Sequence, residues 1–376
     1  MNDVLKKMRS ICNEKIQENM YLFALLLYSF RMVFRNSLII QFSSYTKLLV
    51  YLAVYALILP KIVFQKYNKK QLIVTGCILG LGAMAYYFNR TRNIIAIVFM
   101  LVGVKDCDLK KVAKIVFSVT AFFVCIHTFA YFYTHFANGG TLANTPFFDR
   151  SVNRSTVLCK SFNNYGAVTA FLILQYVYLT DRNKNKYIKF AVLLFLSIFF
   201  YAVGTSRTSM LISLMAALSL LLENCEPIKR KMGSFRKASF IVCVILSVSM
   251  FFADAGDPMI QKIDVLFSGR ISLSALARQM YGLSLFPQVE EILNSPIILD
   301  NFVNYLGIVY GLILAGIFLV LVYYIANNHK NDWFTEYMMI VTYAWALTER
   351  YPLYVTLTLI PLVTLYNFYR DYENEE

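Results

Sequence analysis

A succession of long apolar stretches constrains most strongly what this chain can fold into. Most of them approach the roughly 17 to 25 residues that a helix needs to cross a bilayer. Each is predicted to be a helix, because in lipid every backbone group must find its hydrogen-bond partner within the segment. A membrane barrel would instead show alternating polarity in segments of about ten residues. The predicted spans are 20–41, 46–64, 71–89, 93–104, 112–134, 165–180, 187–204, 208–222, 238–253, 302–326, 334–349 and 353–369.

The composition supports the same fold class. Of 376 residues 58% are hydrophobic and the mean hydropathy is +0.55, which is more apolar surface than a soluble domain can bury. The chain is therefore predicted to be an all-α, polytopic integral membrane protein with about 12 transmembrane helices. Residues 1–19 are polar and no small-residue cleavage site follows the first span, so we expect no removable signal peptide.

Basic residues cluster in alternate short loops and set an orientation by the positive-inside rule. With the N-terminus in the cytoplasm, the clusters at 66–70, 105–114, 182–189 and 229–237 all lie inside. Both termini, including the tail at 370–376, are then cytoplasmic. Most of the net charge of +14 is explained by this orientation, so no nucleic-acid partner is expected.

Arginine predominates among the basic residues expected outside or within the membrane. A planar guanidinium can hold phosphate or carboxylate oxygens through two parallel hydrogen bonds. Arginine at a helix end can also extend toward lipid headgroups, which remains an alternative for any single residue. This alternative does not explain why arginine predominates over lysine on this side of the membrane. The outer face is therefore predicted to bind an anion. The arginines are Arg31, Arg35, Arg90, Arg92, Arg150, Arg154, Arg207, Arg270, Arg278 and Arg350.

Two long polar intervals are expected on the outer side, at 135–164 and 254–301. Unstructured connections of such length are uncommon unless they fold on their own account or are functional. Within the second, 258–267 and 272–285 space their apolar residues at helical intervals, which predicts two short helices lying on the membrane surface. This extracytoplasmic loop is predicted to cover part of the active site.

Three further features are expected beside this loop. Gly204-Thr205-Ser206-Arg207 forms a tight turn whose hydroxyls are suited to capping the next helix, although capping leaves Arg207 unexplained. Glu349-Arg350 interrupts an apolar run. Charged residues there cost free energy unless they are paired with each other or have a function. Asp300-Asn301 directly precedes the span from 302, and Asp300 suits either a catalytic role or a helix N-cap.

The chain resembles a known family in several of these motifs. GTSRTSM at 204–210, SGRISL at 268–273 and LDNFVNYLGIVYG at 299–311 are similar to the Wzy-type polysaccharide polymerases of bacteria, within the O-antigen ligase and polymerase superfamily. The resemblance covers about 162–349. It implies a multi-pass protein of the bacterial plasma membrane that joins sugar repeat units carried on undecaprenyl diphosphate outside that membrane. The ligase branch commonly has histidine before the helix after the loop, whereas Asp300 and Asn301 stand here, which favours the polymerase.

The resemblance implies a lipid-linked oligosaccharide as donor and another as acceptor, membrane lipid around the protein, and a flippase and a chain-length regulator as partners. The lipid diphosphate leaves more readily when its growing charge is neutralised, so Arg207 and Arg270 are the leading candidates for that task. The acceptor hydroxyl loses a proton as it attacks; Asp300 is the first candidate base and Glu349 the second. Arg270→Ala is predicted to abolish glycan elongation. The residues predicted to bind substrate are Arg150, Arg154, Asn163, Asn164, Arg278, Asn301, Tyr305 and Arg350.

Other chemistries have weaker support in the sequence. Asp106-Cys107-Asp108 has the spacing of a metal-binding DxD motif, but Asp108 is better placed to cap the following helix. There is no nucleotide fingerprint, so neither a metal nor another cofactor is expected. The alternative functions are a ligase and a lipid-linked oligosaccharide flippase. A carrier typically shows internal repeats and helices broken near the bilayer midplane, and the sequence contains no evident repeat.

Overall fold

The described part of the computed structural model is helical apart from two antiparallel strands of two residues each, β1 (Phe148–Asp149) and β2 (Arg154–Ser155). The chain folds into two compact units. The first unit comprises 1–66, 103–229 and 356–359, and the second comprises 67–102, 230–355 and 360–376. The structure describes residues 14–90, 92–137, 148–149, 154–155, 157–160, 162–267, 269–288, 299–351 and 354–372.

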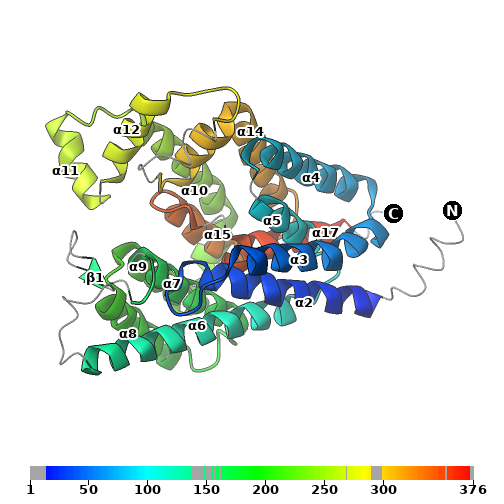
Figure 1. Cartoon of the computed structure of the whole chain (residues 1–376), viewed down its shortest axis with the longest axis horizontal. Coiled ribbons are helices and arrows are strands. Elements are labelled where there is room, and N and C mark those ends of the chain that lie inside the picture. The colour runs from blue at the N-terminus through cyan, green and yellow to red at the C-terminus, as the bar shows by residue number, and fades with distance from the viewer. Residues whose placement is uncertain are drawn as a thin grey trace, which may run out of the picture. The chain divides into compact units, whose positions relative to one another are not determined.

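The first unit is a bundle in which α2 packs against α3 and α6, and α7 packs against α6, α8 and α9 (Figure 1). Gly166 lets α7 approach α9 closely, because a Cβ at this position would lie 2.9 Å from Ser206 Oγ. The helices are α2 (Glu14–Val33), the short 3-10 helix η1 (Phe34–Asn36), α3 (Ser44–Phe64), α6 (Leu109–Ala137), α7 (Phe162–Leu179), α8 (Lys186–Gly204), α9 (Arg207–Leu222) and most of α16 (Val355–Thr358).

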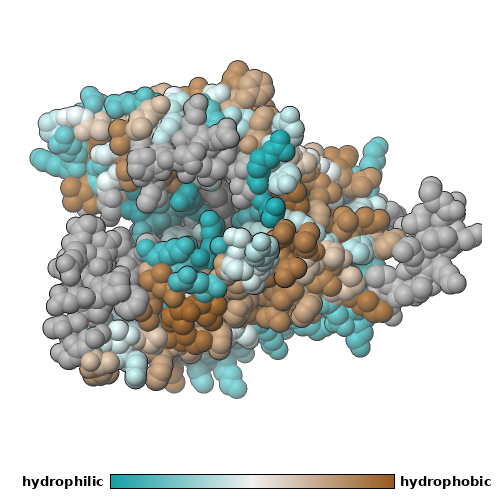
Figure 2. Space-filling model, viewed as in Figure 1, coloured by the Kyte–Doolittle hydropathy of each residue, from teal (hydrophilic) through white to brown (hydrophobic). Residues whose placement is uncertain are grey.

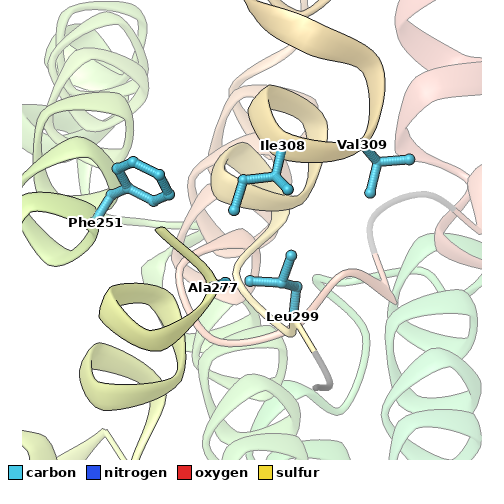
Figure 3. Packing of buried hydrophobic residues seen from close by; sticks show 5 residues of the cluster. All are labelled: Phe251, Ala277, Leu299, Ile308 and Val309. Carbon is cyan, nitrogen blue, oxygen red and sulfur yellow. The ribbon is translucent and has the colours of Figure 1, made fainter. Parts of the chain in front are cut away.

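The second unit packs α12 against α14 around a cluster of buried hydrophobic residues. Phe251 of α10, Ala277 of α12, and Ile308 and Val309 of α14 meet Leu299, which precedes α14 (Figure 3). This cluster fixes the end of the 254–301 interval against three helices, α10, α12 and α14. The helices are α4 (Lys69–Asn89), α5 (Arg92–Val102), most of α10 (Glu226–Phe252), α11 (Pro258–Leu266), α12 (Arg270–Tyr281), α14 (Phe302–Asn327), α15 (Trp333–Ala346) and α17 (Ile360–Asp371).

The protein is a helical membrane protein with several helices suited to crossing the bilayer. Among the described residues six helices are long and apolar enough to do so, namely α3, α4, α6, α8, α10 and α14. Figure 2 shows hydrophobic side chains over broad areas of one face of the molecule. Large apolar residues such as Leu49, Phe129 and Phe195 are mostly exposed, as expected for helices surrounded by lipid.

Helices lie in all twelve predicted ranges, but twelve continuous spans are not found in the described residues. The predicted span 353–369 is divided at Leu359, whose φ of 62° lies in the left-handed region, into the four-residue α16 and the twelve-residue α17. The predicted span 20–41 ends as an α-helix at Val33. Beyond it the hydroxyl of Ser37 accepts the backbone N–H groups of Ile39 and Ile40, which turns the chain away from the helix.

The helix α14 is also interrupted, at Gly311, where φ is 75° and ψ is 161°. Backbone N–H and C=O groups that lose their helical partners at this break bind the segment 284–288 instead. Leu312 N–H donates to Ser284 O at 2.9 Å, and Gln288 N–H donates to Val309 O at 3.3 Å. Backbone groups at membrane depth must be satisfied within the protein. The segment 284–288 therefore replaces part of the missing helical hydrogen bonding.

Gly311→Ala is expected to lower the free energy of unfolding by about 1 to 3 kcal/mol, the cost of holding a side chain in this backbone conformation. The added Cβ would also lie 2.6 Å from the Phe286 carbonyl carbon and 2.7 Å from Leu285 O. Thermal unfolding in detergent measures the effect. Gly316→Ala is the matched control on the same helix, because nothing lies within 4 Å of its Cβ position; equal shifts for both variants would contradict this account.

Candidate active site

Two short helices occupy the middle of the 254–301 interval, as the sequence predicted. The prediction of 258–267 corresponds to α11, and the prediction of 272–285 corresponds to α12, which begins at Arg270 and ends at Tyr281. The second helix stops early because Gly282 follows with a φ of 66°. That these helices lie on the membrane surface remains a prediction.

Arg270 is buried at the start of α12, where its guanidinium is surrounded by acceptors. Nη2 donates to Glu349 Oε1 at 2.5 Å and Nη1 donates to Phe267 O at 3.0 Å, while Nε donates to Thr348 O. Asp300 Oδ2 lies 3.8 Å from Nη2. Arg270 thus joins α12 to the carboxylates at the ends of two other elements, and most of its donors already have protein partners.

Asp300 and Glu349 form a partly neutralised acidic pair around this guanidinium. Burial is the largest cause that raises the pKa of each carboxyl, and the charge of Asp300 raises the pKa of Glu349 further. Arg270 and Arg350 oppose these shifts by favouring the ionised forms. The Asp300 side chain is 20% exposed and the Glu349 side chain 5%, so Asp300 is the more accessible carboxylate of the pair.

The N-cap of α14 is Asn301, so Asp300 is not needed for capping. Asn301 Oδ1 accepts Asn304 N–H at 2.9 Å, and its amide donates to Ser247 Oγ at 3.0 Å and to Leu347 O at 2.9 Å. Its side chain is buried. The capping alternative for Asp300 is therefore wrong, and Asn301 holds α10, α14 and the end of α15 together instead of facing a substrate.

Arg350 is the accessible cation beside the acidic pair. Its guanidinium lies 5.1 Å from the ring centroid of Tyr305, and the residue is exposed. Arg278 lies 5.7 Å from the ring of Phe252 in the same way. The Tyr305 ring thus supports a guanidinium in a favourable cation–π geometry, and its predicted role in binding substrate stays a prediction.

The first unit contains a separate polar group at the adjoining N-termini of α7 and α9. Arg207 is the first residue of α9 and is exposed. Ser206 makes no side-chain cap to the helix backbone; its hydroxyl contacts Ser209 Oγ at 2.9 Å and Asn163 Oδ1 at 3.5 Å. Both helix N-termini carry partial positive charge, and with Arg207 they make a region favourable to an anion.

The other predicted ligands in this unit have different positions. Asn164 Oδ1 accepts the amide of Asn36 at 2.9 Å, which ties α7 to the turn after α2. Arg154 belongs to β2, but its side chain lies outside the described part of the structure, as does Arg150 altogether. The two groups, around Arg207 and around Arg270, belong to different units.

Comparison with known proteins gives no match. No protein-family model, no curated protein and no solved structure matches this chain. The polymerase resemblance therefore depends on the motifs alone.

The DxD-like motif has a structural role on the helix α6. Asp108 Oδ1 accepts Lys110 N–H at 2.8 Å, which confirms the capping interpretation for Asp108, and Asp106 Oδ2 accepts the amide of Gln65 at 2.9 Å. Within the described residues no three His, Cys, Asp or Glu side chains gather as a metal site. Asp106 and Asp108 are thus engaged with the protein itself.

Sequence reasoning missed two residues that shape the site. Asp264 binds the backbone at the start of α12, and Ser274 accepts the amide of Asn304 at 3.1 Å. Both connect α12 to its surroundings. The only signal in the sequence was the position of Asp264 six residues before Arg270, which is not distinctive.

Proposed function

We propose that this protein polymerises oligosaccharide repeat units carried on undecaprenyl diphosphate, at the outer face of the bacterial plasma membrane. The observation that carries the proposal is the acidic pair held by Arg270, formed by Asp300 just before α14 and Glu349 just after α15. In the reaction an acceptor sugar hydroxyl attacks the anomeric carbon of the donor. The new glycosidic C–O bond forms as the bond to the lipid diphosphate breaks.

Asp300 is the general base of this proposal. It is the more exposed carboxylate of the pair, and burial raises its pKa, which makes it a stronger base than an ordinary aspartate. A base with a pKa nearer the working pH transfers a proton more effectively. Asp300 takes the hydroxyl proton, and the buried Glu349 with Arg270 holds it in position.

The leaving diphosphate gains negative charge as its bond breaks, and exposed guanidiniums suit its stabilisation. Arg350 is the accessible cation beside the acidic pair, with Arg278 as a further candidate in the same unit. Arg207, the first residue of α9 in the first unit, stays a candidate from the sequence motifs alone. Arg270, predicted as a leading phosphate ligand, is better suited by its buried partners to holding the carboxylates.

The pH dependence of polymerisation should follow from the charges around Asp300. The base is active when ionised, so the rate falls as the pH falls through its raised pKa, above the ordinary 3.8. Arg350 lowers that pKa, so Arg350→Gln is expected to move the acidic limb of the pH–rate profile to higher pH. Arg278→Gln is the matched control, and an unshifted limb in Arg350→Gln would remove Arg350 from the site.

Cell-surface glycan from a deletion strain tests the proposed function. A strain without the protein should carry single-repeat material, and the wild-type gene should restore long chains. Ordinary glycan lengths in the deletion strain would contradict polymerisation. Glycan of normal length that stays on the lipid would indicate a ligase instead.

One observation favours a second candidate, a flippase for the same lipid-linked repeats. Carriers typically contain helices broken near the bilayer midplane, and α14 is interrupted at Gly311 while the chain between α16 and α17 is interrupted at Leu359. The outcome that separates the two candidates is the location of unpolymerised lipid-linked repeats. They should stay on the inner leaflet when a flippase is missing and reach the outer leaflet when a polymerase is missing.

A further inference from the structure

We propose that Asp264 is a positioning residue that sets Arg270 against the acidic pair, an inference that rests on the proposed function of that pair. Asp264 lies on α11 and is buried. It has no place among the residues that the sequence motifs indicate. Its role follows from what its carboxylate and carbonyl bind.

The carboxylate of Asp264 closes the start of α12. Oδ1 accepts Ile271 N–H at 2.7 Å and Oδ2 accepts Ser272 N–H at 3.1 Å, and Oδ2 also accepts the Ser272 hydroxyl. The first N–H groups of a helix have no partner within the helix, and an acceptor with negative charge is favoured there. Asp264 therefore caps α12 from a different helix.

The same residue fixes the turn that leads into Arg270. Asp264 O accepts Gly269 N–H at 2.9 Å, and Gly269 adopts a φ of 81°, which is favourable for glycine. Gly269 itself provides no side-chain cap. The main-chain oxygen of Asp264 thus binds the backbone just before Arg270, and its carboxylate binds the backbone just after it.

The turn closed by Asp264 also supplies a ligand for the guanidinium. Phe267 O, within this turn, accepts Arg270 Nη1 at 3.0 Å. Asp264 therefore binds the backbone on both sides of Arg270, at Gly269 and Ile271, while Phe267 O binds its guanidinium. The groups that then face the guanidinium are Glu349 and Asp300, with Arg350 nearby acting on both carboxyls.

Loss of Asp264 should release Arg270 from the carboxylates without removing any group that meets the substrate. Arg270 lowers the pKa of both Asp300 and Glu349, so its displacement raises their pKa further. The acidic limb of the pH–rate profile should then move to higher pH. A purely structural role for Asp264 would lower the amount of folded protein but would leave that limb in place.

The test compares Asp264→Ala and Asp264→Asn with the matched control Asp257→Ala. Asp257 caps α11 by accepting Met259 N–H at 2.7 Å and has no contact with Arg270 in the described structure. Asp264→Ala is expected to lower the rate by on the order of 10- to 100-fold per folded molecule, as small misplacements in active sites do. The acidic limb of its pH–rate profile should move to higher pH. Asp264→Asn, which keeps one acceptor oxygen, should show a smaller shift of that limb.

The inference would be overturned if the acidic limb of the pH–rate profile stayed in place in Asp264→Ala. It would also be overturned if that limb moved equally in Asp257→Ala. A second measurement separates this inference from the proposed function, since it requires no polymerase activity. If Asp264 acts through Arg270, the melting-temperature shifts of Asp264→Ala and Arg270→Met should not add in the double variant. Additive shifts would contradict the positioning role even where no polymer is formed.

Discussion

Replacing Asp300 by asparagine is expected to slow polymerisation by about 10²- to 10⁴-fold, the usual contribution of a general base. The variant keeps the size of the side chain and removes its ability to take a proton. Its stability should change little, because the helix α14 is capped by Asn301 and not by Asp300. The measurement is the yield of polymer per folded molecule, together with the melting temperature in detergent.

Asn301→Ala, at the neighbouring position, is expected to lose stability but keep activity. It removes the cap and leaves Ser247 Oγ and Leu347 O without the amide they bind, so its stability should fall by about 1 to 3 kcal/mol. Its remaining folded fraction should still polymerise.

An Asp300→Asn variant that makes polymer of normal length would exclude Asp300 as the base.

The second large effect concerns the buried pair Arg270 and Glu349. Removing one partner leaves a charge in a buried place, which costs about 3 to 5 kcal/mol, whereas replacing both by apolar residues is often tolerated. Glu349→Ala should therefore be strongly destabilised, and Arg270→Met/Glu349→Leu should recover part of that loss. The double variant should nevertheless be inactive, because Asp300 loses the groups that hold it.

The matched control for this pair lies at the other end of α15. Arg236 and Glu336 form a second buried ion pair, and in the described part of the chain neither contacts Asp300. Arg236→Met/Glu336→Leu should likewise recover stability relative to Glu336→Ala while keeping polymerisation. Equal activity in the two double variants would show that the Arg270–Glu349 pair serves the fold and not the reaction.

The helical membrane fold was readable from the sequence because apolar length and backbone hydrogen bonding leave few alternatives. The two short helices at 258–266 and 270–281 followed from the spacing of their apolar residues. The sequence motifs placed Arg270, Asp300 and Glu349 in one predicted active site, but not in contact with one another. Their direct contact depends on the packing of α12 against α14, which no local pattern specifies.

Other features depend on tertiary packing and could not be predicted. The break at Gly311 lies within a continuous apolar run and is stabilised by the distant segment 284–288. Asp300 and Asn301 are both good N-cap residues, so the sequence could not tell which one caps α14. The burial of Arg270 likewise comes from acceptors on three separate segments, including Phe267 O and Thr348 O.

The most direct test of the central claim uses the purified protein in lipid vesicles with a single-repeat oligosaccharide on undecaprenyl diphosphate. Products are resolved by length, and free undecaprenyl diphosphate is measured with them. We expect a ladder of repeat multiples with release of one lipid diphosphate for each bond formed, and no ladder from Asp300→Asn. Unchanged single repeats with the wild-type protein, or repeats that only cross the bilayer, would contradict the account.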